Sequence, residues 1–337
     1  MYLISPHKKQ YKANLHSHST LSDGRKTPEQ LKEMYKNKGY SILSITDHNF
    51  CHKHPEMTDD DFIMITGYET EIKADYGEDR NNPYNKSIHI NLFARDPEND
   101  SFYWYHPSYF VYMTKEEQDL LTKSGPQRPR EFTPEFISEF VQTAKECGYL
   151  ASLNHPTWSN LSDEDVLKFD GFFSMEMCNF SACSDCHEHN DGLYDKLLIA
   201  GKRIFCHGSD DNHNRHPENS PAFDSFGAFT MIMPDEFTYD SIFDAMEKGE
   251  MYSSTGPTFT EVSIEGNKLH VECSEVVKIA ISNGTCIRKK VWADPGKTIT
   301  SADFEIPEVS RYIRVTIIDE NGNHADTRGY FRDELGL

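Results

Sequence analysis

Short apolar segments that lead into a histidine or a carboxylate recur along the first 213 residues. This recurrence constrains the fold most strongly. Examples are YSILSITDH, DFIMITGYETEI, YLASLNHP and RIFCHGSDDNHN, and SIHINLFA and FFSMEMCN are further strand-like segments. Helix-like stretches lie between several of them, including TPEFISEFVQTAKECG and GLYDKLLIAGK. Buried strands that alternate with helices predict a mainly parallel α/β architecture.

The first helix-like stretch along the chain carries sequence signals at both of its ends. In TPEQLKEMYKNKG, Thr27 is the expected N-cap, Pro28 takes the first helical position and Gln30 completes a capping box. Gly39 is the expected stop. We therefore expect a helix from residue 28 to the residues just before Gly39.

The stretch NLHSHSTLSDG, residues 14–24, places two histidines two positions apart. Residues i and i+2 of a strand point to the same face, so His16 and His18 present two imidazoles together, with Asp23 in the following turn. Similar residues recur at or just after later strands, and each of them alone has an ordinary structural explanation. The full set of candidate metal ligands is His16, His18, Asp23, His48, Glu69, His89, His155, Asp210, Asp211 and His213. Because active-site residues of an α/β barrel lie at one end of the strands, the recurrence predicts one metal-binding site.

Composition agrees with a metalloprotein. The chain has 337 residues, 16 histidines and a formal charge of −21, from 55 acidic and 34 basic residues. Such acidity disfavours nucleic-acid binding, and bound cations would neutralise part of it. MYLISPHKKQ has no apolar signal core and no stretch approaches 18 apolar residues, so we expect a cytoplasmic protein that does not bind membranes, with its eight cysteines reduced.

The sequence pattern changes after MYSSTGPTFTEV. Segments such as VSIEGNKLHVEC and RYIRVTIIDENGNHADTRGYF alternate apolar and polar residues around Gly-containing turns. We predict a barrel domain over residues 1–255 and a small all-β sandwich over 256–337. An aromatic-rich insertion at about 97–131 is either a lid over the site or a helical excursion that buries its aromatic residues in the core.

The blocks LHSHSTLSDG, SITDHN, GYETEI, HINLFA, NHP and GSDDNH resemble the PHP (polymerase and histidinol phosphatase) superfamily of metal-dependent phosphoesterases. The resemblance implies a distorted (β/α)7 barrel with two or three bound divalent ions, of zinc, iron or manganese. It implies that His16, His18, Glu69 and the Asp of the D-x-H motif hold a first ion. Glu69 would bridge to a second ion held by His89 and His155, and Asp23, His48 and His213 would hold a third.

The D-x-H motif departs from the family pattern. The family commonly reads G-S-D-x-H, whereas this chain has Gly208, Ser209, Asp210, Asp211, Asn212, His213. Counting from the glycine selects Asp210, and counting back from the histidine selects Asp211. We favour Asp211, with Asp210 orienting a ligand.

The implied function is a metal-dependent phosphoesterase that hydrolyses a phosphomonoester or small cyclic phosphodiester. Grouped cations lower the pKa of a water and supply hydroxide at neutral pH, with His48, Asp211 and His213 as the catalytic residues. The alternatives are hydrolysis of a carboxyl or carbamate ester, and a metal-containing binding module without activity. Arg128, Arg130 and Arg215 are the candidates for contacting a phosphate.

Three further signals are weaker. Cys183 and Cys186 form a C-x-x-C pair with Cys178, His187 and His189 nearby, but a partner C-x-x-C is missing. Surface thiols are therefore favoured over a structural zinc site. Asp47 is expected to cap a helix or orient a ligand, and His207 to line the pocket.

Overall fold

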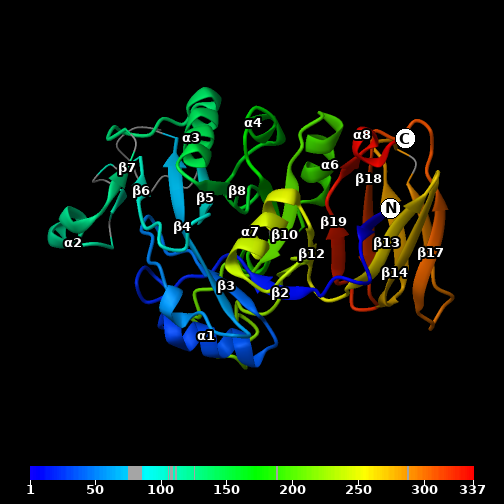
Figure 1. Cartoon of the computed structure of the whole chain (residues 1–337), viewed down its shortest axis with the longest axis horizontal. Coiled ribbons are helices and arrows are strands. Elements are labelled where there is room, and N and C mark those ends of the chain that lie inside the picture. The colour runs from blue at the N-terminus through cyan, green and yellow to red at the C-terminus, as the bar shows by residue number, and fades with distance from the viewer. Residues whose placement is uncertain are drawn as a thin grey trace.

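The computed structural model describes residues 1–74, 86–104, 106, 109–110, 112–124, 126–186, 189–286 and 288–337, without the side chains of residues 102, 103 and 124. The predicted insertion therefore lies partly outside the described residues. The chain forms a mixed α/β structure with one large sheet (Figure 1). All the labelled helices except α8 gather around the strands of the first 250 residues, and antiparallel strands fill the opposite side of the molecule together with α8.

The two helices with Thr-Pro starts form as the sequence predicts. Helix α1 (Pro28–Asn37) has a complete capping box between Thr27 and Gln30, and the backbone of Gly39 is left-handed just beyond its end. Helix α3 (Pro134–Glu146) starts at the N-cap Thr133. The remaining helices are α2 (Lys115–Leu120), α4 (Asp163–Leu167), α5 (Phe180–Ser184), α6 (Asp191–Ile199), α7 (Tyr239–Lys248), α8 (Arg332–Leu335) and the 3-10 helix η1 (Pro55–Met57).

The large sheet runs in the order β10-β9-β8-β5-β4-β3-β2-β11-β12-β19-β18-β15-β16, with β20 paired to β18. Its first half comprises β2 (Tyr11–Asn14), β3 (Ile42–Ile45), β4 (Ile63–Lys73), β5 (Ser87–Ala94), β8 (Tyr149–Leu153), β9 (Ser174–Asn179) and β10 (Phe205–Ser209). A separate pair is formed by β6 (Phe102–Tyr103) and β7 (Lys123–Ser124). The strands that carry the predicted ligands are thus neighbours in one sheet.

One strand of this group runs against the expected direction. Strands β2, β3 and β4 pair in parallel, as do β8, β9 and β10, but β5 is antiparallel to both of its neighbours. The reversal places the start of β5 beside the far end of β4, with Glu71 opposite His89. His89, the third residue of β5, therefore reaches the same edge as residues that follow the parallel strands.

The two ends of this seven-strand group approach each other. The backbone N–H of Asp211 donates to the carbonyl of His16 at 2.9 Å, and the N–H of His18 donates to the carbonyl of Asn212 at 3.0 Å. Ser17 and Asn212 form a parallel bridge between them. The segments that follow β2 and β10, which carry the H-x-H and D-x-H motifs, are thereby held side by side.

The large sheet continues without a break into the C-terminal part. Strands β11 (Phe229–Ile232) and β12 (Met251–Ser254) lead to β19 (His324–Thr327), β18 (Tyr312–Ile318), β15 (Lys278–Ser282), β16 (Lys289–Trp292) and β20 (Tyr330–Phe331). Here β12 pairs directly with β19. Figure 1 shows β19 next to β12 in the middle of the molecule.

A second, four-stranded antiparallel sheet shares an apolar core with these C-terminal strands. It contains β1 (Tyr2–Ile4), β13 (Phe259–Glu265), β14 (Lys268–Val276) and β17 (Ile299–Glu305). The pairing of β1 with β13 was not foreseen, because a three-residue strand carries little pattern of its own. Both termini therefore lie on the C-terminal side of the molecule (Figure 1). In the part of the chain that the structure describes, no helix combines the length and apolar character that a membrane crossing needs.

Candidate metal centre

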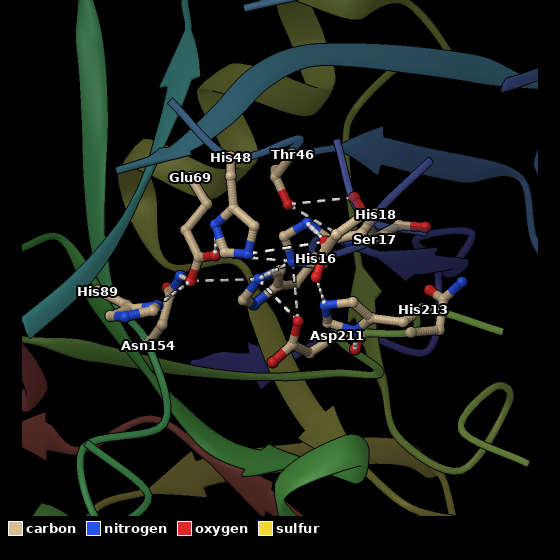
Figure 2. Close-up of polar contacts among 12 residues, drawn as sticks. His16, Ser17, His18, Thr46, His48, Glu69, His89, Asn154, Asp211 and His213 are labelled. Carbon is tan, nitrogen blue, oxygen red and sulfur yellow. Dashed lines mark hydrogen bonds and ion pairs between the residues drawn. The ribbon is translucent and has the colours of Figure 1, made fainter. Parts of the chain in front are cut away.

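Nine of the ten predicted ligands meet at the edge of the sheet where the parallel strands end. All of them except Asp23 and His155 are labelled in Figure 2. His16 and His18 follow β2, and His48 follows β3. Glu69 lies within the long strand β4, and the side chain of Glu69 reaches into the cluster. His155 follows β8, whereas Asp211 and His213 follow β10. The topology thus gathers residues that are up to 197 positions apart in the chain.

The centre of the cluster is a triangle of ligand atoms from His16, His18 and Asp211. The Nε2 atoms of the two histidines lie 3.2 Å apart, and Asp211 Oδ1 lies 3.1 Å from the first and 3.0 Å from the second. Two ligands of one ion with bonds of about 2.1 Å stand about 3.0–3.4 Å apart. The three atoms therefore have the spacing of one face of a metal coordination shell.

Glu69 connects this triangle to a second group. Its Oε1 lies 3.4 Å from His16 Nε2, 3.0 Å from His89 Nδ1 and 3.3 Å from His155 Nε2. The amide of Asn154 also donates to Oε1, at 2.9 Å, which fixes the carboxylate in place. Glu69 is thus placed between two sets of imidazoles, as a bridging carboxylate would be.

A third group lies on the other side of His18. His213 Nε2 is 3.3 Å from Asp23 Oδ2, and His48 Nε2 is 3.8 Å from Asp23 Oδ1. His48 also reaches back to Glu69, with its Nδ1 2.9 Å from Oε2. The grouping in space matches the three sets of ligands that the family resemblance implies.

The buried carboxylates of the cluster are held in their charged form. Burial alone would raise the pKa of Glu69, but the neighbouring imidazoles of His89 and His16 outweigh it and leave the pKa well below the ordinary value. The same balance of burial against His16 lowers the pKa of Asp211. Burial and the nearby His213 lower the pKa of His18 to about 4, so its imidazole is neutral at pH 7. At the other histidines burial, which lowers the pKa, is outweighed by the neighbouring carboxylates, which raise the pKa of His16, His155 and His213, and that of His48 to about 9. A divalent ion requires anionic carboxylates and neutral imidazoles, so its binding would displace the protons of these histidines.

Several buried atoms of the cluster lack a hydrogen bond within the described part of the chain. They are Asp211 Oδ1, Asp23 Oδ1 and His18 Nδ1. Buried polar atoms rarely remain unsatisfied, so these three positions mark where a ligand belongs. The residues present therefore fit two or three divalent ions.

Asp210 does not join the cluster. Its carboxylate accepts hydrogen bonds from the backbone N–H groups of Phe226, Gly227 and Ala228, at 2.7–3.0 Å, and from the hydroxyl of Tyr35 at 2.7 Å. Burial nevertheless raises the pKa of Asp210 to about 6. Asp211, the next residue, has a left-handed backbone with φ of 54°. Its own side chain points toward His16 and His18. Of the two aspartates, only Asp211 faces the candidate metal centre.

Glu176 is a member of the site that the sequence analysis missed. It lies inside β9, fully buried, and its Oε1 accepts a hydrogen bond from His16 Nδ1 at 2.7 Å. Its Oε2 accepts from the backbone N–H of His155 at 2.7 Å and from Asn179 at 2.9 Å. Burial and the opposing effect of His16 leave its pKa at about 2. The available signal was a charged residue between two methionines, because a charge in a buried strand needs a partner.

Of the two remaining predicted residues, Asp47 holds the cluster in place, whereas His207 is buried in the sheet and does not line the cavity, contrary to the prediction. Asp47 accepts hydrogen bonds from the backbone and hydroxyl of Ser19 and from the hydroxyl of Ser22, which shapes the loop after the H-x-H motif. His207 is buried within β10, with Nδ1 3.1 Å from the hydroxyl of Ser174. Asp47 thus supports the ligand loop, whereas His207 lies below the site in the sheet.

A cavity of about 650 Å³ opens onto the cluster. Its walls include His48, His213 and Asp211, which are the three predicted catalytic residues. Other lining residues are Trp158, Ser181, Asp185, Arg215, His216 and Asp224. The cavity therefore gives a small molecule access to the candidate metal ligands.

Only one of the three candidate arginines reaches this cavity. Arg215 lines it and donates to Asp23 Oδ2 at 2.8 Å. Arg130 is buried and donates to the carbonyls of Glu71 and Trp104, and Arg128 pairs with Glu131 at 2.9 Å. Arg215 is thus the predicted arginine that is placed to meet a substrate.

The described part of the insertion at about 97–131 buries aromatic residues in the core, and one further aromatic residue contacts a metal ligand. Trp104 and Phe110 are buried in the main core, as in a structural excursion. Tyr112 is instead about half exposed, and its ring stacks on His48 with centroids 6.0 Å apart. The part of the insertion around Tyr112 covers one flank of the metal ligands.

Among the described residues, no cysteine of the C-x-x-C segment belongs to a group of ligands that could hold a metal ion. Cys178 and Cys183 have sulfur atoms 3.6 Å apart, whereas Cys186 is exposed. His187 lies outside the described residues. These thiols do not take part in the candidate metal centre.

Comparison with known proteins gives similarity in structure only. The sequence matches no family model, and no curated protein matches it significantly. The structure is similar to that of a two-domain protein from Bacteroides vulgatus that contains a predicted PHP-like metal-dependent phosphoesterase, with 13% identity, 97% of each chain covered and a TM-score of 0.45. It is also similar to a protein from Bifidobacterium adolescentis proposed to be a metal-dependent phosphoesterase, with 17% identity over 64% of this chain and 92% of the other, and a TM-score of 0.38.

A third similar structure is an amidohydrolase from Chromobacterium violaceum with bound sulfate and no metal. It is 15% identical, covers 60% of this chain and 87% of its own, and has a TM-score of 0.38. Each of these identities is too low to assign individual residues. The assignment of function to this chain therefore depends on its own side chains.

Proposed function

We propose that this chain is a metal-dependent phosphoesterase of PHP type. In this proposal β2, β3, β4, β5, β8, β9 and β10 form a distorted seven-stranded barrel, and the C-terminal strands form a β sandwich. The ligand triangle of His16, His18 and Asp211, joined to the other histidines through Glu69, is the observation that carries the proposal. Bound divalent ions would lower the pKa of a water and neutralise charge that develops on a phosphate.

The chain's own residues have distinct tasks in this proposal. Glu69 and Asp211 would hold divalent ions, and both carboxylates are already oriented. The amide of Asn154 donates to Glu69, and the amide of Asn179 donates to Asp211 Oδ2 at 3.1 Å. His48 and His213 line the cavity at the edge of the cluster. With two ions bound and the third position empty, an imidazole there could donate a proton to a leaving oxygen. Arg215 pairs with Asp23, lines the cavity and is placed to contact a phosphate oxygen.

The charge of the cavity favours a small substrate with a single phosphate. Apart from the cluster, its walls carry Asp185 and Asp224 against Arg215 and His216. An extended polyanion would meet net repulsion there, whereas one phosphate would be neutralised by the ions. We propose a phosphomonoester or a small cyclic phosphodiester as the substrate, and neither nucleic acid nor membrane as a partner.

Hydrolysis of a carboxyl or carbamate ester is the second candidate. The specific observation in its favour is that Arg215 is already paired with Asp23, so the walls hold little spare positive charge for a phosphate. Such a reaction would use the same ligands and the same proton donors.

The test is a side-by-side screen of aryl phosphate, aryl carboxylate and aryl carbamate esters with protein loaded with zinc, manganese or iron(II). We expect metal-dependent turnover of the phosphate ester, inhibited by free phosphate, in the wild type and in the surface control Asp303→Asn. Turnover restricted to carboxylate or carbamate esters would establish the second candidate. Absence of turnover by a folded, fully metallated sample would leave a binding module.

A further inference from the structure

A second group of metal-type ligands lies away from the candidate metal centre, where the first half of the large sheet meets the C-terminal strands. His189, His324 and Asp326 each offer one ligand atom, and these atoms lie within 4.8 Å of one another. His189 belongs to the segment between α5 and α6, whereas the other two residues belong to β19. The rings of His189 and His324 are stacked, with centroids 4.6 Å apart and planes 25° apart.

The carboxylate of Asp326 has one oxygen engaged and one available. Oδ1 accepts hydrogen bonds from Arg314 Nη1 and Thr316 Oγ1, both at 2.6 Å. Oδ2 is buried and makes no hydrogen bond within the part of the chain that the structure describes, although Asp326 is only 1% exposed. A buried carboxylate oxygen without a donor needs a partner, and the two imidazoles in reach mark the direction of a cation.

The surrounding contacts orient Asp326 as metal ligands are oriented in proteins. Arg314 holds Oδ1 on one side and contacts Asp195 Oδ1 at 3.0 Å on the other, so its charge is shared between two carboxylates. Outer contacts of this kind fix a ligating carboxylate and leave its second oxygen directed at the ion. Asn190, next to His189, donates to the carbonyl of Glu176 at 3.1 Å, which anchors the other side of the group to β9.

We propose that His189, His324 and Asp326 form a second, structural metal site for one divalent transition-metal ion, with zinc as the best match. Two imidazoles and one carboxylate suit zinc, and water completes a tetrahedral shell. The ion would join the segment after α5 to β19. Because α5 residues line the cavity of the candidate metal centre, this ion would fix one cavity wall against the C-terminal strands. The site stands independently of whether the main cluster is catalytic.

The experiment counts metal ions. Protein is stripped with a chelator, reloaded with excess zinc, freed of unbound ion and measured by inductively coupled plasma mass spectrometry, and zinc affinity is measured by titration calorimetry. We expect His189→Ala and His324→Ala each to bind one ion fewer than the wild type. The control His270→Ala removes a histidine of β14 that is paired with Asp303, and it should bind the wild-type number.

A further variant separates metal binding from ring stacking. His324→Phe keeps an aromatic ring beside His189 but cannot bind zinc, so it should also bind one ion fewer. Zinc added to the wild type should raise the thermal midpoint more than it does for His324→Phe, because the second site contributes only in the wild type. Equal numbers of ions in the wild type, His324→Ala and His324→Phe would overturn the proposal and leave the contact as stacking only.

Discussion

Glu176 Oε1 lies 2.7 Å from Nδ1 of His16, and this contact turns the opposite ring nitrogen, Nε2, toward His18 and Asp211. The glutamate is therefore not only a buried charge that has found a partner. It fixes which nitrogen of His16 is free to bind an ion.

Replacing Glu176 by glutamine should weaken metal binding while the fold remains. The carboxylate accepts four hydrogen bonds, from His16, His155, Asn179 and Ser209, and an amide has only one oxygen to offer them. We expect metal affinity to fall by about 10–100-fold, as for other losses of an outer partner of a ligand. Competition with a chromophoric chelator measures this, with Glu272→Gln as the exposed control. An unchanged affinity would show that Glu176 does not orient His16.

Substitutions of Asp210 and Asp211 should affect different properties, stability for the first and metal binding and turnover for the second. Asp211→Asn removes the charge at the centre of the ligand triangle, so hydrolysis should fall by several orders of magnitude and fewer ions should be retained. His48→Ala, which removes a cavity-lining ligand, should also lower turnover by orders of magnitude. Assays of turnover and of metal content on the same preparations measure both effects.

Asp210→Asn should instead lower stability. Asparagine cannot accept hydrogen bonds from three backbone N–H groups and Tyr35 at once, and the unsatisfied donors should cost about 1–3 kcal/mol in the free energy of unfolding. Urea unfolding measures the loss, and metal content should stay at the wild-type number. A loss of ions from folded Asp210→Asn with Asp211→Asn fully loaded would reverse the assignment of the ligand.

Glu69→Gln should release more than one ion. Its Oε1 and Oε2 together contact His16, His48, His89 and His155, so a neutral side chain weakens two groups of ligands at once. Metal counting on Glu69→Gln and on the exposed control Glu272→Gln, from β14, tests this. Loss of a single ion from Glu69→Gln would contradict its bridging role.

Removing residues 256–337 should prevent folding. The deletion takes away β19, the partner of β12, and removes Arg314 and Tyr312 from the buried carboxylate of Asp195. A buried charge without its partners and an open sheet edge both favour unfolding and aggregation. Circular dichroism and size-exclusion chromatography on residues 1–255 measure the effect. A monomer that melts cooperatively and binds the full number of ions would show that the first part folds alone.

The sequence was sufficient for features that depend on local chemistry. Helices α1 and α3 begin at Thr27 and Thr133 because capping and proline act within one turn, and the apolar strands form where their patterns predict. The mixed α/β class follows from that alternation. The recurrence of ligand-type residues after strands was enough to select nine residues that the structure brings together.

Features that depend on distant pairing could not be predicted. Neither the antiparallel direction of β5 nor the pairing of β1 with β13 leaves a local pattern. Asp210 and Asp211 are chemically identical neighbours, and they differ only in the backbone that surrounds them, with three N–H groups around one and a left-handed φ at the other. Glu176 could not be predicted because a lone glutamate inside a strand belongs to no motif that marks it as a partner of His16.

The occupancy of the cluster itself is tested most directly by anomalous X-ray diffraction. Crystals of zinc- or manganese-loaded protein would be measured on both sides of the absorption edge of the metal. We predict two or three peaks, one beside the triangle of His16, His18 and Asp211 and one between Glu69, His89 and His155. A fully loaded crystal with no anomalous peak among these residues would contradict the account.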